Sequence, residues 1–285
     1  MINPGLVILN HNNSAQIEKL LESIHKQQLP NIICLVDNSE SDEEEEKLNQ
    51  LLVRFSELNI RLIPTSNLGY FQGNLTGVEN LYHQSSVNHA LILNPDILCN
   101  NWRRLIEVLC SYYQTDENCF IVGPKITIPG FSIVSSPIIP FLLWREIAYN
   151  LFFPFSNPVL KYFHTRLSKK SGKVFAVEGS CYMIDCKKTI DNKDYFSDIF
   201  LYGEETIFGK IAEKNNWNIW FDNSVEALHL HPPGEVSPMY DKYMPLSYTK
   251  IAEKFYSNKF ALKIFSLSIK YRFKVRKMLV RLMKK

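Results

Sequence analysis

The sequence lacks the marks of a secreted, disulfide-bonded or zinc-binding protein. Its six cysteines are scattered, with no CxxC pair and no Cys/His spacing typical of a zinc site, so we expect reduced thiols in or near the core. Residues 1–13 contain no basic segment followed by an apolar stretch, and this absence indicates no secretory signal. We therefore expect a globular protein that stays in the cytosol.

Acidic residues are missing from residues 259–285, which hold ten of the 32 Lys and Arg residues. The rest of the chain is acidic, although the net charge of the whole is +3. Cations that alternate with apolar residues are typical of a helix lying on anionic lipid headgroups. A helix that binds nucleic acid or docks on a protein fits the same pattern, but an acidic body repels nucleic acid. We expect membrane contact through residues 259–285 and no nucleic-acid partner.

The first 125 residues alternate short apolar runs with amphipathic helical patterns. This alternation predicts an α/β fold with a central, mostly parallel sheet flanked by helices. The expected strands are Leu6–Leu9, Ile32–Val36, Arg61–Pro64, Ala90–Leu93, Phe120–Gly123 and, further on, Trp217–Phe221. The expected helices cover Ile17–Ile24, Leu48–Leu58, Gly73–His83, Trp102–Leu109 and Glu204–Lys214.

Residues 127–170 break this rhythm with five prolines and an aromatic-rich run from Pro140 to Phe155. The run is interrupted, and Arg145-Glu146 lies at its centre, so it is not a membrane-spanning helix. Two interpretations stay open. The segment is either an insertion over a ligand site that touches lipid, or an ordinary packing segment.

Polar residues follow four of the expected strands. They are Asn10-His11-Asn12, Asp37-Asn38-Ser39, Asn67-Leu68-Gly69 and Asn94-Pro95-Asp96. In open sheets of this kind ligands bind just beyond the carboxyl ends of the strands. Each triplet by itself fits a simple turn, since these residue types favour turns for local reasons. Four of them at one sheet edge predict a site for a polar ligand.

The order and spacing of these segments resemble the family 2 glycosyltransferases of the GT-A fold, especially the bacterial polysaccharide branch that includes rhamnosyltransferases. The resemblance extends from about Leu6 to about His231. It implies a GT-A domain at 1–235, made of a nucleotide-binding half (1–125), a variable insertion (126–173) and an acceptor or catalytic half (174–235), followed by a helical basic tail at 236–285. The motifs that carry it are the four triplets, Gly73-Asn74, Glu178 to Ile184, Phe200 to Glu205, and His229.

The resemblance implies a nucleotide-sugar donor, UDP- or dTDP-linked. Asp37 would accept a hydrogen bond from the ring N3–H of the pyrimidine, because a carboxylate pairs well with an N–H on the base edge. Without the family, Asp37 reads as a turn residue. The other residues implied to contact the donor are Asn10, His11, Asn67, Gly69, Asn74, Asn94, Asp96 and Gly179, with the glycines allowing close backbone approach.

Asn94-Pro95-Asp96 stands where the family has its Asp-x-Asp motif. A diphosphate leaving group needs its charge neutralised, and Mg²⁺ or Mn²⁺ held by a carboxylate supplies this. The resemblance makes Asp96 the metal ligand, with His229 as the second candidate and His231 as the next. The first acid of the motif is replaced by Asn94, so one strong ligand remains there. A histidine at such a position is otherwise an ordinary surface residue.

Glu204-Glu205 matches the family's Glu-Asp pair at the start of a helix. An inverting transfer needs a carboxylate that removes the proton of the acceptor hydroxyl. Glu205 stands at the position of the family's base and Glu204 would orient or bind, but glutamate is one methylene longer than aspartate, which leaves open which of them is the base. Two acids in a first helical turn also stabilise the helix dipole without any catalytic role.

The residues and the resemblance together predict an inverting glycosyltransferase. Its acceptor would be a lipid-linked glycan in the synthesis of a cell-surface polysaccharide, and the enzyme would lie on the cytoplasmic face of the cell membrane. A sugar nucleotidyltransferase is an alternative, but the first strand is not followed by a glycine-rich phosphate loop with a basic residue. A non-catalytic membrane-bound scaffold with the same fold is another, because Asn94 and Glu205 depart from the family pattern.

Overall fold

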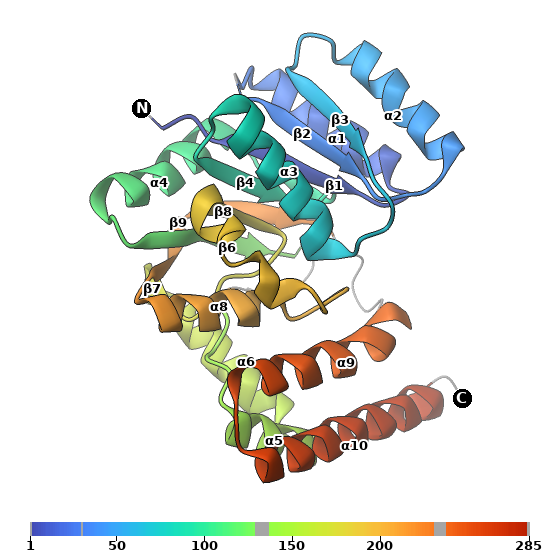
Figure 1. Ribbon diagram of the computed structural model, residues 1–285, viewed down its shortest axis with the longest axis vertical. Coiled ribbons are helices and arrows are strands. Elements are labelled where there is room, and N and C mark those ends of the chain that lie inside the picture. Colours follow the sequence, from blue (N-terminus) through green and yellow to red (C-terminus); the bar gives the residue numbers. More distant parts are fainter. Residues whose placement is uncertain (1, 30, 129–136, 231–237, 284–285) are drawn as a thin grey trace.

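The computed structural model describes residues 2–29, 31–128, 137–230 and 238–283. Helices cover a central sheet, and a further layer of helices lies beneath it (Figure 1). Nine strands make up the sheet in the described residues: β1 (Gly5–Asn10), β2 (Ile33–Asp37), β3 (Ile60–Pro64), β4 (His89–Leu93), β5 (Ile97–Leu98), β6 (Cys119–Thr127), β7 (Gly172–Val174), β8 (Cys181–Asp185) and β9 (Asn218–His229). The helices are α1 (Ser14–Lys26), α2 (Asp42–Arg54), α3 (Tyr70–Ser85), α4 (Trp102–Thr115), α5 (Leu143–Leu151), α6 (Asn157–Leu167), α7 (Cys186–Ile190), the 3₁₀ turn η1 (Lys193–Phe196), α8 (Glu204–Asn215), α9 (Pro238–Phe255) and α10 (Lys259–Met283).

The strand order is β3-β2-β1-β4-β8-β6-β9-β5, and β7 pairs with β9. β1, β2, β3 and β4 are paired in parallel, whereas β8 runs antiparallel to both β4 and β6. The predicted α/β fold class with its mostly parallel sheet is therefore confirmed. In the register Asn10 pairs with Asp37 and Asp37 with Pro64, so the carboxyl ends of these strands meet at one edge.

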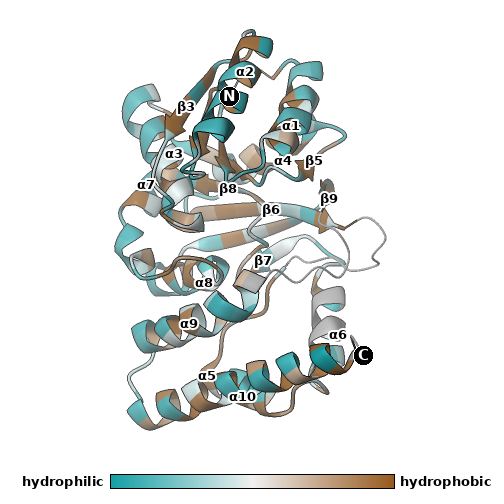
Figure 2. Cartoon of the chain, turned by 90° about the vertical axis from the view of Figure 1, so that its right-hand side faces the viewer, coloured by the Kyte–Doolittle hydropathy of each residue, from teal (hydrophilic) through white to brown (hydrophobic). Residues whose placement is uncertain are grey.

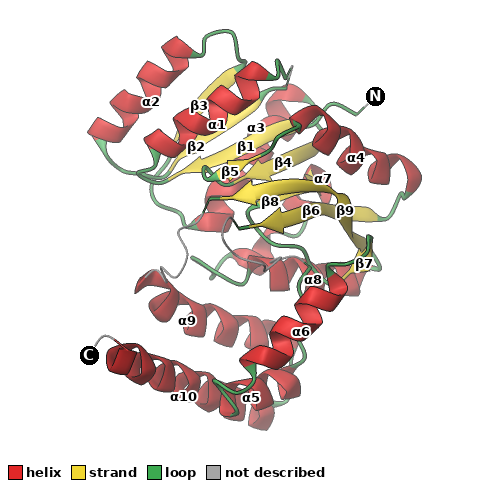
Figure 3. Cartoon of the chain, turned by 180° about the vertical axis from the view of Figure 1, so that it is seen from behind, coloured by secondary structure: helices red, strands yellow, loops and turns green. Residues whose placement is uncertain are grey.

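β1, β2 and β4 are buried on both faces, which explains why they read as continuous apolar runs. Along β1, Leu6 and Ile8 join the cluster under α1, α2 and α4, while Val7 joins the cluster under α3 and α8 (Figure 3). Trp102 is fully buried in the first cluster, and its indole Nε1 donates to Ser23 Oγ at 2.9 Å. All six cysteines are buried and free, as predicted.

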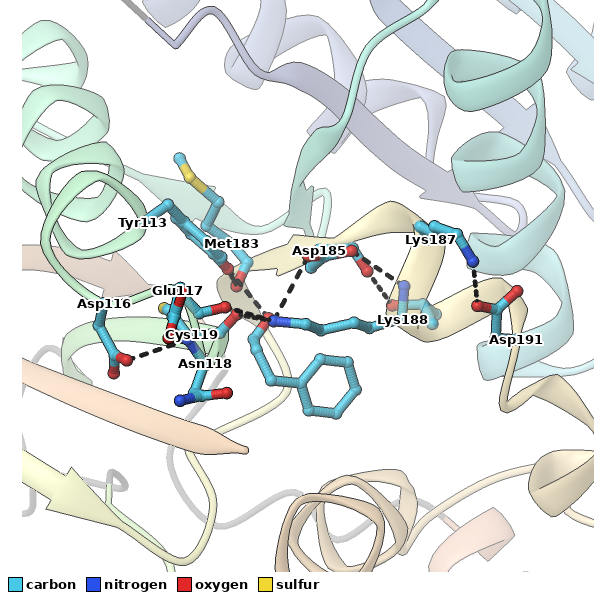
Figure 4. A network of polar contacts seen from close by, with 12 residues as sticks. Tyr113, Asp116, Glu117, Asn118, Cys119, Met183, Asp185, Lys187, Lys188 and Asp191 are labelled. Carbon is cyan, nitrogen blue, oxygen red and sulfur yellow. Dashed lines mark hydrogen bonds and ion pairs between the residues drawn. The ribbon is translucent and has the colours of Figure 1, made fainter. Parts of the chain in front are cut away.

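The edge of the sheet opposite the predicted site is held by a polar network around Lys188 (Figure 4). Lys188 Nζ donates to the carbonyl oxygens of Cys119 (2.7 Å) and Glu117 (3.2 Å), and Asp185 Oδ1 accepts from the Lys188 backbone N–H at 2.9 Å. Tyr113 Oη donates to the Met183 carbonyl oxygen at 2.9 Å. These bonds fasten the turn before β6 to the end of β8, so the network has a structural role.

The third layer consists of α5, α9 and α10. Leu143 and Ile147 of α5 are buried in one cluster with Phe265 and Ile269 of α10. α5 therefore packs against α10. Contact of residues 127–170 with lipid stays a prediction, and residues 129–136 lie outside the described part. The predicted helical tail is present as α9 and α10. Among the described helices none is both long and apolar enough to cross a bilayer.

Candidate functional site

A polar cavity of about 300 Å³ lies at the carboxyl ends of β1 to β4. Its lining includes five of the predicted site residues: His11, Asn67, Gly69, Asn94 and Asp96. Each of the four polar triplets thus contributes at least one residue to this lining, so the polar strand ends converge on one cavity. The rest of the lining includes Asn38, Tyr70, Phe200, Tyr202 and Met239.

Gly69 allows the loop before α8 to close against this cavity. Its φ is +85°, and a Cβ there would collide with the Phe200 carbonyl oxygen. The same carbonyl accepts from the Tyr70 backbone N–H at 2.9 Å, and Asn38 Nδ2 donates to the Gly69 carbonyl oxygen at 3.1 Å. Any side chain at this position would push the two walls of the cavity apart.

Asp37 and Asn10 lie behind the cavity wall and outside its lining. Asp37 is 4% exposed, and its Oδ1 accepts from Asn10 Nδ2 (2.9 Å), the Ser39 N–H (3.1 Å) and Ser39 Oγ (2.5 Å). Glu44 Oε1 joins this network by accepting from Asn10 Nδ2 at 3.1 Å and from the Ser14 N–H at 2.6 Å. The network fixes the starts of α1 and α2 to the strand ends. Contact of Asp37 and Asn10 with a donor stays a prediction.

Asn74 also lies beneath the cavity, on the first turns of α3. It is 2% exposed, its Nδ2 donates to the Tyr70 carbonyl oxygen at 3.1 Å, and its Oδ1 has no hydrogen-bond partner among the described residues. Its predicted donor contact is likewise untested.

Tyr70 joins the two sides of the site, a role that the sequence analysis did not assign. Its Oη lies 2.8 Å from Asn94 Oδ1 and 2.5 Å from the Gly179 carbonyl oxygen. Burial raises the pKa of Tyr70 well above its ordinary value, so the hydroxyl keeps its proton and stays a donor. The sequence signal for this role was the position of Tyr70 directly after Gly69, at the start of α3.

Asp96 and His229, the two predicted metal ligands, are in contact. His229 Nε2 lies 3.1 Å from Asp96 Oδ2, because β9 ends beside β5 and pairs His229 with Ile97. On the other side of the ring, Nδ1 lies 3.6 Å from Glu178 Oε1. Burial lowers the pKa of His229, but the hydrogen bond to Asp96 and the charge of Glu178 outweigh burial and raise it.

Glu178 is a second residue whose role the sequence analysis missed, although it opens one of the motifs. Its Oε2 accepts from the Ser180 N–H at 3.0 Å and from Ser180 Oγ, which leaves Oε1 directed toward His229. Metal-binding histidines usually donate their other ring N–H to a carboxylate, which fixes the tautomer. Glu178 occupies that place relative to His229. The sequence signal for this role was an acidic residue that follows an apolar run just before the buried strand β8.

The chemistry of Asp96 and His229 fits a divalent ion. Neighbouring ligands of an octahedral ion with bonds of about 2.1 Å lie about 3 Å apart, which is the observed separation of Nε2 and Oδ2. The described residues hold no group of three such ligands, so phosphate oxygens and water would complete the shell. His231, the alternative ligand, lies outside the described residues.

Glu204 and Glu205 begin α8 after Gly203, whose φ is +96°. Glu204 is 4% exposed and Glu205 is partly exposed. Burial and the charge of Glu205 raise the pKa of Glu204 to about 8, and burial followed by the charge of Glu178 raises that of Glu205 to about 7. A solvated helix start would leave such acids exposed and ordinary, so the helix-dipole interpretation does not account for them.

Gly179 makes a close approach, but to Glu205. A Cβ on Gly179 would lie 2.6 Å from Glu205 Oε1, so a side chain at this position would displace the Glu205 carboxylate. The carbonyl of Gly179 is the one that Tyr70, a residue of the cavity lining, contacts. Glu178, which contacts His229, directly precedes Gly179, so the predicted base lies near one predicted metal ligand.

A larger cavity, of about 690 Å³, lies far from these residues, between α5 and α6. Its wall is mostly apolar and contains one ion pair, Arg145 with Glu146 at 2.7 Å. Cavity size alone would point to this place, but the convergent polar groups lie at the sheet edge, and sites are defined by such groups.

No model of a known protein family matches the chain. One curated protein, the low-salt glycan biosynthesis hexosyltransferase Agl10 of Haloferax volcanii, is 28% identical over 231 residues, which are 80% of this chain and 67% of Agl10.

Three solved structures resemble the chain in fold. GalNAc-T7 with UDP, GalNAc and Mn²⁺ gives a TM-score of 0.60 at 14% identity, over 95% of this chain and 54% of that one. The mannosyltransferase PcManGT from Pyrobaculum calidifontis, in complex with GDP-Man and Mn²⁺, gives a TM-score of 0.58 at 13% identity, over 95% of this chain and 75% of that one. TarS from S. aureus gives a TM-score of 0.54 at 14% identity, over 95% of this chain and 44% of that one. The chain thus spans about half the length of GalNAc-T7 and TarS, and its fold is the GT-A fold of glycosyltransferases.

Proposed function

We propose that the chain is a glycosyltransferase that moves a sugar from a nucleotide-sugar donor to a glycan acceptor. The observation that carries the proposal is the pair of Asp96 and His229, 3.1 Å apart beside the polar cavity at the strand ends. The fold is shared with glycosyltransferases solved with UDP or GDP-Man and Mn²⁺, and the relative Agl10 is a hexosyltransferase. Within that fold, we place the chain in family 2, in the polysaccharide branch that includes rhamnosyltransferases.

The donor is a UDP- or dTDP-sugar. His11, Asn38 and Asn67 give the cavity the hydrogen-bonding groups that a nucleoside requires. Asp37 directly precedes Asn38, a residue of the cavity lining, and its carboxylate is the proposed acceptor for a pyrimidine N3–H. Sugars linked to GDP belong in the test, because PcManGT was solved with GDP-Man.

Asp96 and His229 hold a divalent ion, Mg²⁺ or Mn²⁺, against the donor diphosphate. The ion would neutralise the charge that develops on the diphosphate as the glycosidic bond breaks. Carboxylates suit both ions and imidazole suits transition metals, so the mixed pair favours Mn²⁺. Glu178 orients the His229 ring so that Nε2 faces the ion.

Glu205 is the base of an inverting transfer. It is partly exposed, whereas Glu204 is buried, so Glu205 is the one of the two that an acceptor hydroxyl can reach. Its raised pKa makes it a stronger base than an ordinary carboxylate. Glu205 takes the hydroxyl proton as the acceptor oxygen attacks the anomeric carbon, and the bond to the diphosphate breaks on the opposite face. Glu204 supports Glu205 from behind.

The acceptor is a lipid-linked glycan at the cytoplasmic face of the cell membrane. Support comes from the basic helix α10, which carries cations next to exposed apolar side chains. An enzyme held there would meet acceptors anchored in the bilayer. GT-A domain 1–235 would carry the chemistry and residues 236–285 the attachment.

A donor-cleavage assay tests this function. Release of nucleoside diphosphate is measured over UDP-, dTDP- and GDP-sugars, with and without Mn²⁺, using membrane extract as the source of acceptor. We expect release from a pyrimidine donor, dependent on Mn²⁺ and absent in Asp96→Ala, with Val53→Ser as a control on an exposed residue of α2. No turnover of any donor would leave the non-catalytic scaffold as the better account.

A further inference from the structure

Two helices outside the proposed active site form the outermost layer of the molecule. α5 runs beside α10, with Tyr256 Oη donating to the Phe141 carbonyl oxygen (2.6 Å) near one end and Asn150 Nδ2 donating to Ser268 Oγ (3.2 Å) near the other. Figures 1 and 3 show this pair at the greatest distance from the sheet, with α9 in between. An exposed side chain on the outer side of either helix therefore points away from the sheet.

The buried face of α10 uses only some of its apolar residues. Ala261, Phe265, Ile269 and Phe273 recur every four residues, are at most 4% exposed and pack in the cluster that includes α5. Figure 2 shows hydrophobic and hydrophilic segments alternating along the helix. A second apolar stripe remains uncovered, with its members 48–71% exposed: Phe260, Leu267, Tyr271, Met278 and Leu282. Their spacing of seven and four residues places them on one face of the helix.

The neighbouring helix α5 also carries exposed apolar side chains. Trp144 and Leu151, seven residues apart and so on one face, are 58% and 49% exposed. In the turn that follows, Phe152 is 68% and Phe155 is 83% exposed, and both also line the apolar cavity between α5 and α6. Several exposed apolar side chains on two adjacent helices indicate a contact with a protein or a membrane.

Charge distinguishes between these two partners. Five exposed cations recur along the edge of the α10 stripe, at Lys263, Lys270, Lys274, Lys277 and Arg281. Residues 259–285 contain no acidic side chain to neutralise them. An apolar stripe bordered along its length by cations matches acyl chains bordered by anionic headgroups. A second copy of the chain would instead place these cations against one another or against apolar surface.

We propose that the outer side of α5, the Phe152–Phe155 turn and the apolar stripe of α10 together form one membrane face, which binds an anionic phospholipid bilayer. Trp144 and Leu151 then enter the bilayer surface together with the apolar stripe of α10, while the cations of α10 contact the headgroups. The inference deepens the proposed membrane attachment and rests on it for the choice of partner. Its new content is that α5, far from the basic tail in sequence, supplies part of the anchor.

The packing of α5 on α10 gives this face a fixed orientation. The two helices share a buried cluster and the hydrogen bond between Asn150 and Ser268, so they bind the bilayer as one unit without refolding. A free amphipathic tail would allow the domain to rotate above the membrane. The composite face instead holds the sheet and its site at one angle to the lipid, where a membrane-anchored acceptor can reach it.

Vesicle flotation of the full chain tests the face. We use vesicles of phosphatidylcholine alone and of phosphatidylcholine with phosphatidylglycerol, and expect binding to the anionic vesicles that weakens with salt. Trp144→Ser and Leu151→Ser should each lower the apparent affinity roughly tenfold, because each removes one inserted apolar side chain. Val53→Ser, which alters a side chain that is 78% exposed on α2, should leave it within about twofold. Tryptophan fluorescence should shift to the blue on vesicle binding, and this shift should be lost in Trp144→Phe.

Two results would overturn the proposal. Equal vesicle affinity for the wild type, Trp144→Ser and Leu151→Ser would confine any attachment to the tail. A dimer in solution that Trp144→Ser dissociates would show that a second copy covers this face. Neither measurement needs sugar transfer, so an inactive chain that binds anionic vesicles through Trp144 would refute the proposed function and leave the membrane face standing.

Discussion

Two clusters of buried carboxylates stand on either side of the cavity, and they are built differently. Asp37 and Glu44 each accept two or more hydrogen bonds from nearby N–H and O–H groups. Glu204 is as deeply buried, yet its Oε1 has no partner in the described part of the chain, and Glu205 lies beside it. A satisfied network rigidifies a structure, whereas buried acids with raised pKa values are typical of proton transfer. We therefore propose that the first cluster holds the fold and that the second performs the chemistry.

The largest expected effect separates the clusters by activity. Glu205→Gln keeps the shape of the side chain and removes the base, so we expect kcat to fall on the order of 10³-fold with little change in donor KM. Single-turnover kinetics with the donor identified by the release assay measures this. Glu44→Gln serves as the matched change in the other cluster, because Glu44 has no proposed contact with the donor. A larger loss of kcat in Glu44→Gln than in Glu205→Gln would contradict the assignment of the base.

The next effect separates them by stability. Asp37→Ala leaves Asn10 and two donors of Ser39 without their acceptor, so the free energy of unfolding should fall by about 3 kcal/mol. Urea denaturation followed by circular dichroism gives this value. Glu46→Ala, on the exposed side of α2, should change it by less than about 0.5 kcal/mol. Similar free energies of unfolding for Asp37→Ala and Glu46→Ala would contradict a structural role of Asp37.

A smaller effect tests how the two sides are joined. Glu178→Gln should weaken Mn²⁺ binding about tenfold, because the carboxylate that orients His229 is lost while both proposed ligands remain. Isothermal titration with Mn²⁺ measures this without turnover. Glu226→Gln is a suitable control, since this acid lies on β9 at the surface and pairs with Lys125. An unchanged affinity would show that Glu178 does not act through His229.

The smallest effect concerns pH. The pKa of Glu204 is raised in the folded chain, so between its ordinary value and about 8 the folded state keeps a proton that the unfolded state loses. The free energy of unfolding should therefore fall as pH rises through this window. Glu204→Gln removes the cost of ionising a buried carboxyl. This variant should be more stable than the wild type by about 1 kcal/mol above pH 8, with no gain in stability near pH 5. Denaturation curves that show the same difference at both pH values would contradict the raised pKa.

Much of the sheet could be predicted because its strands are apolar runs bounded by polar turns. Leu6–Leu9 and Ala90–Leu93 lie inside β1 and β4, and the turns after them carry the residues that line the cavity. β5 and β7 could not be predicted, since two or three residues give no periodicity and each forms only by pairing with β9.

The site was predicted less completely, because burial depends on packing between distant segments. The sequence places Asp37 and Asn38 side by side, but only the packed structure shows that Asn38 lines the cavity and Asp37 lies behind it. In the same way, the partner of Gly179 is Glu205, which is 26 residues further along the chain. Motif spacing identifies such residues and leaves their contacts undetermined.

The most direct test of the account is Mn²⁺ binding followed by electron paramagnetic resonance, with and without UDP. The account predicts that UDP strengthens Mn²⁺ binding in the wild type, and that Asp96→Asn and His229→Ala each abolish this coupling while the fold is retained. Mn²⁺ binding that is equally strong in the wild type and both variants, or that ignores UDP, would contradict a metal and diphosphate site at the strand ends.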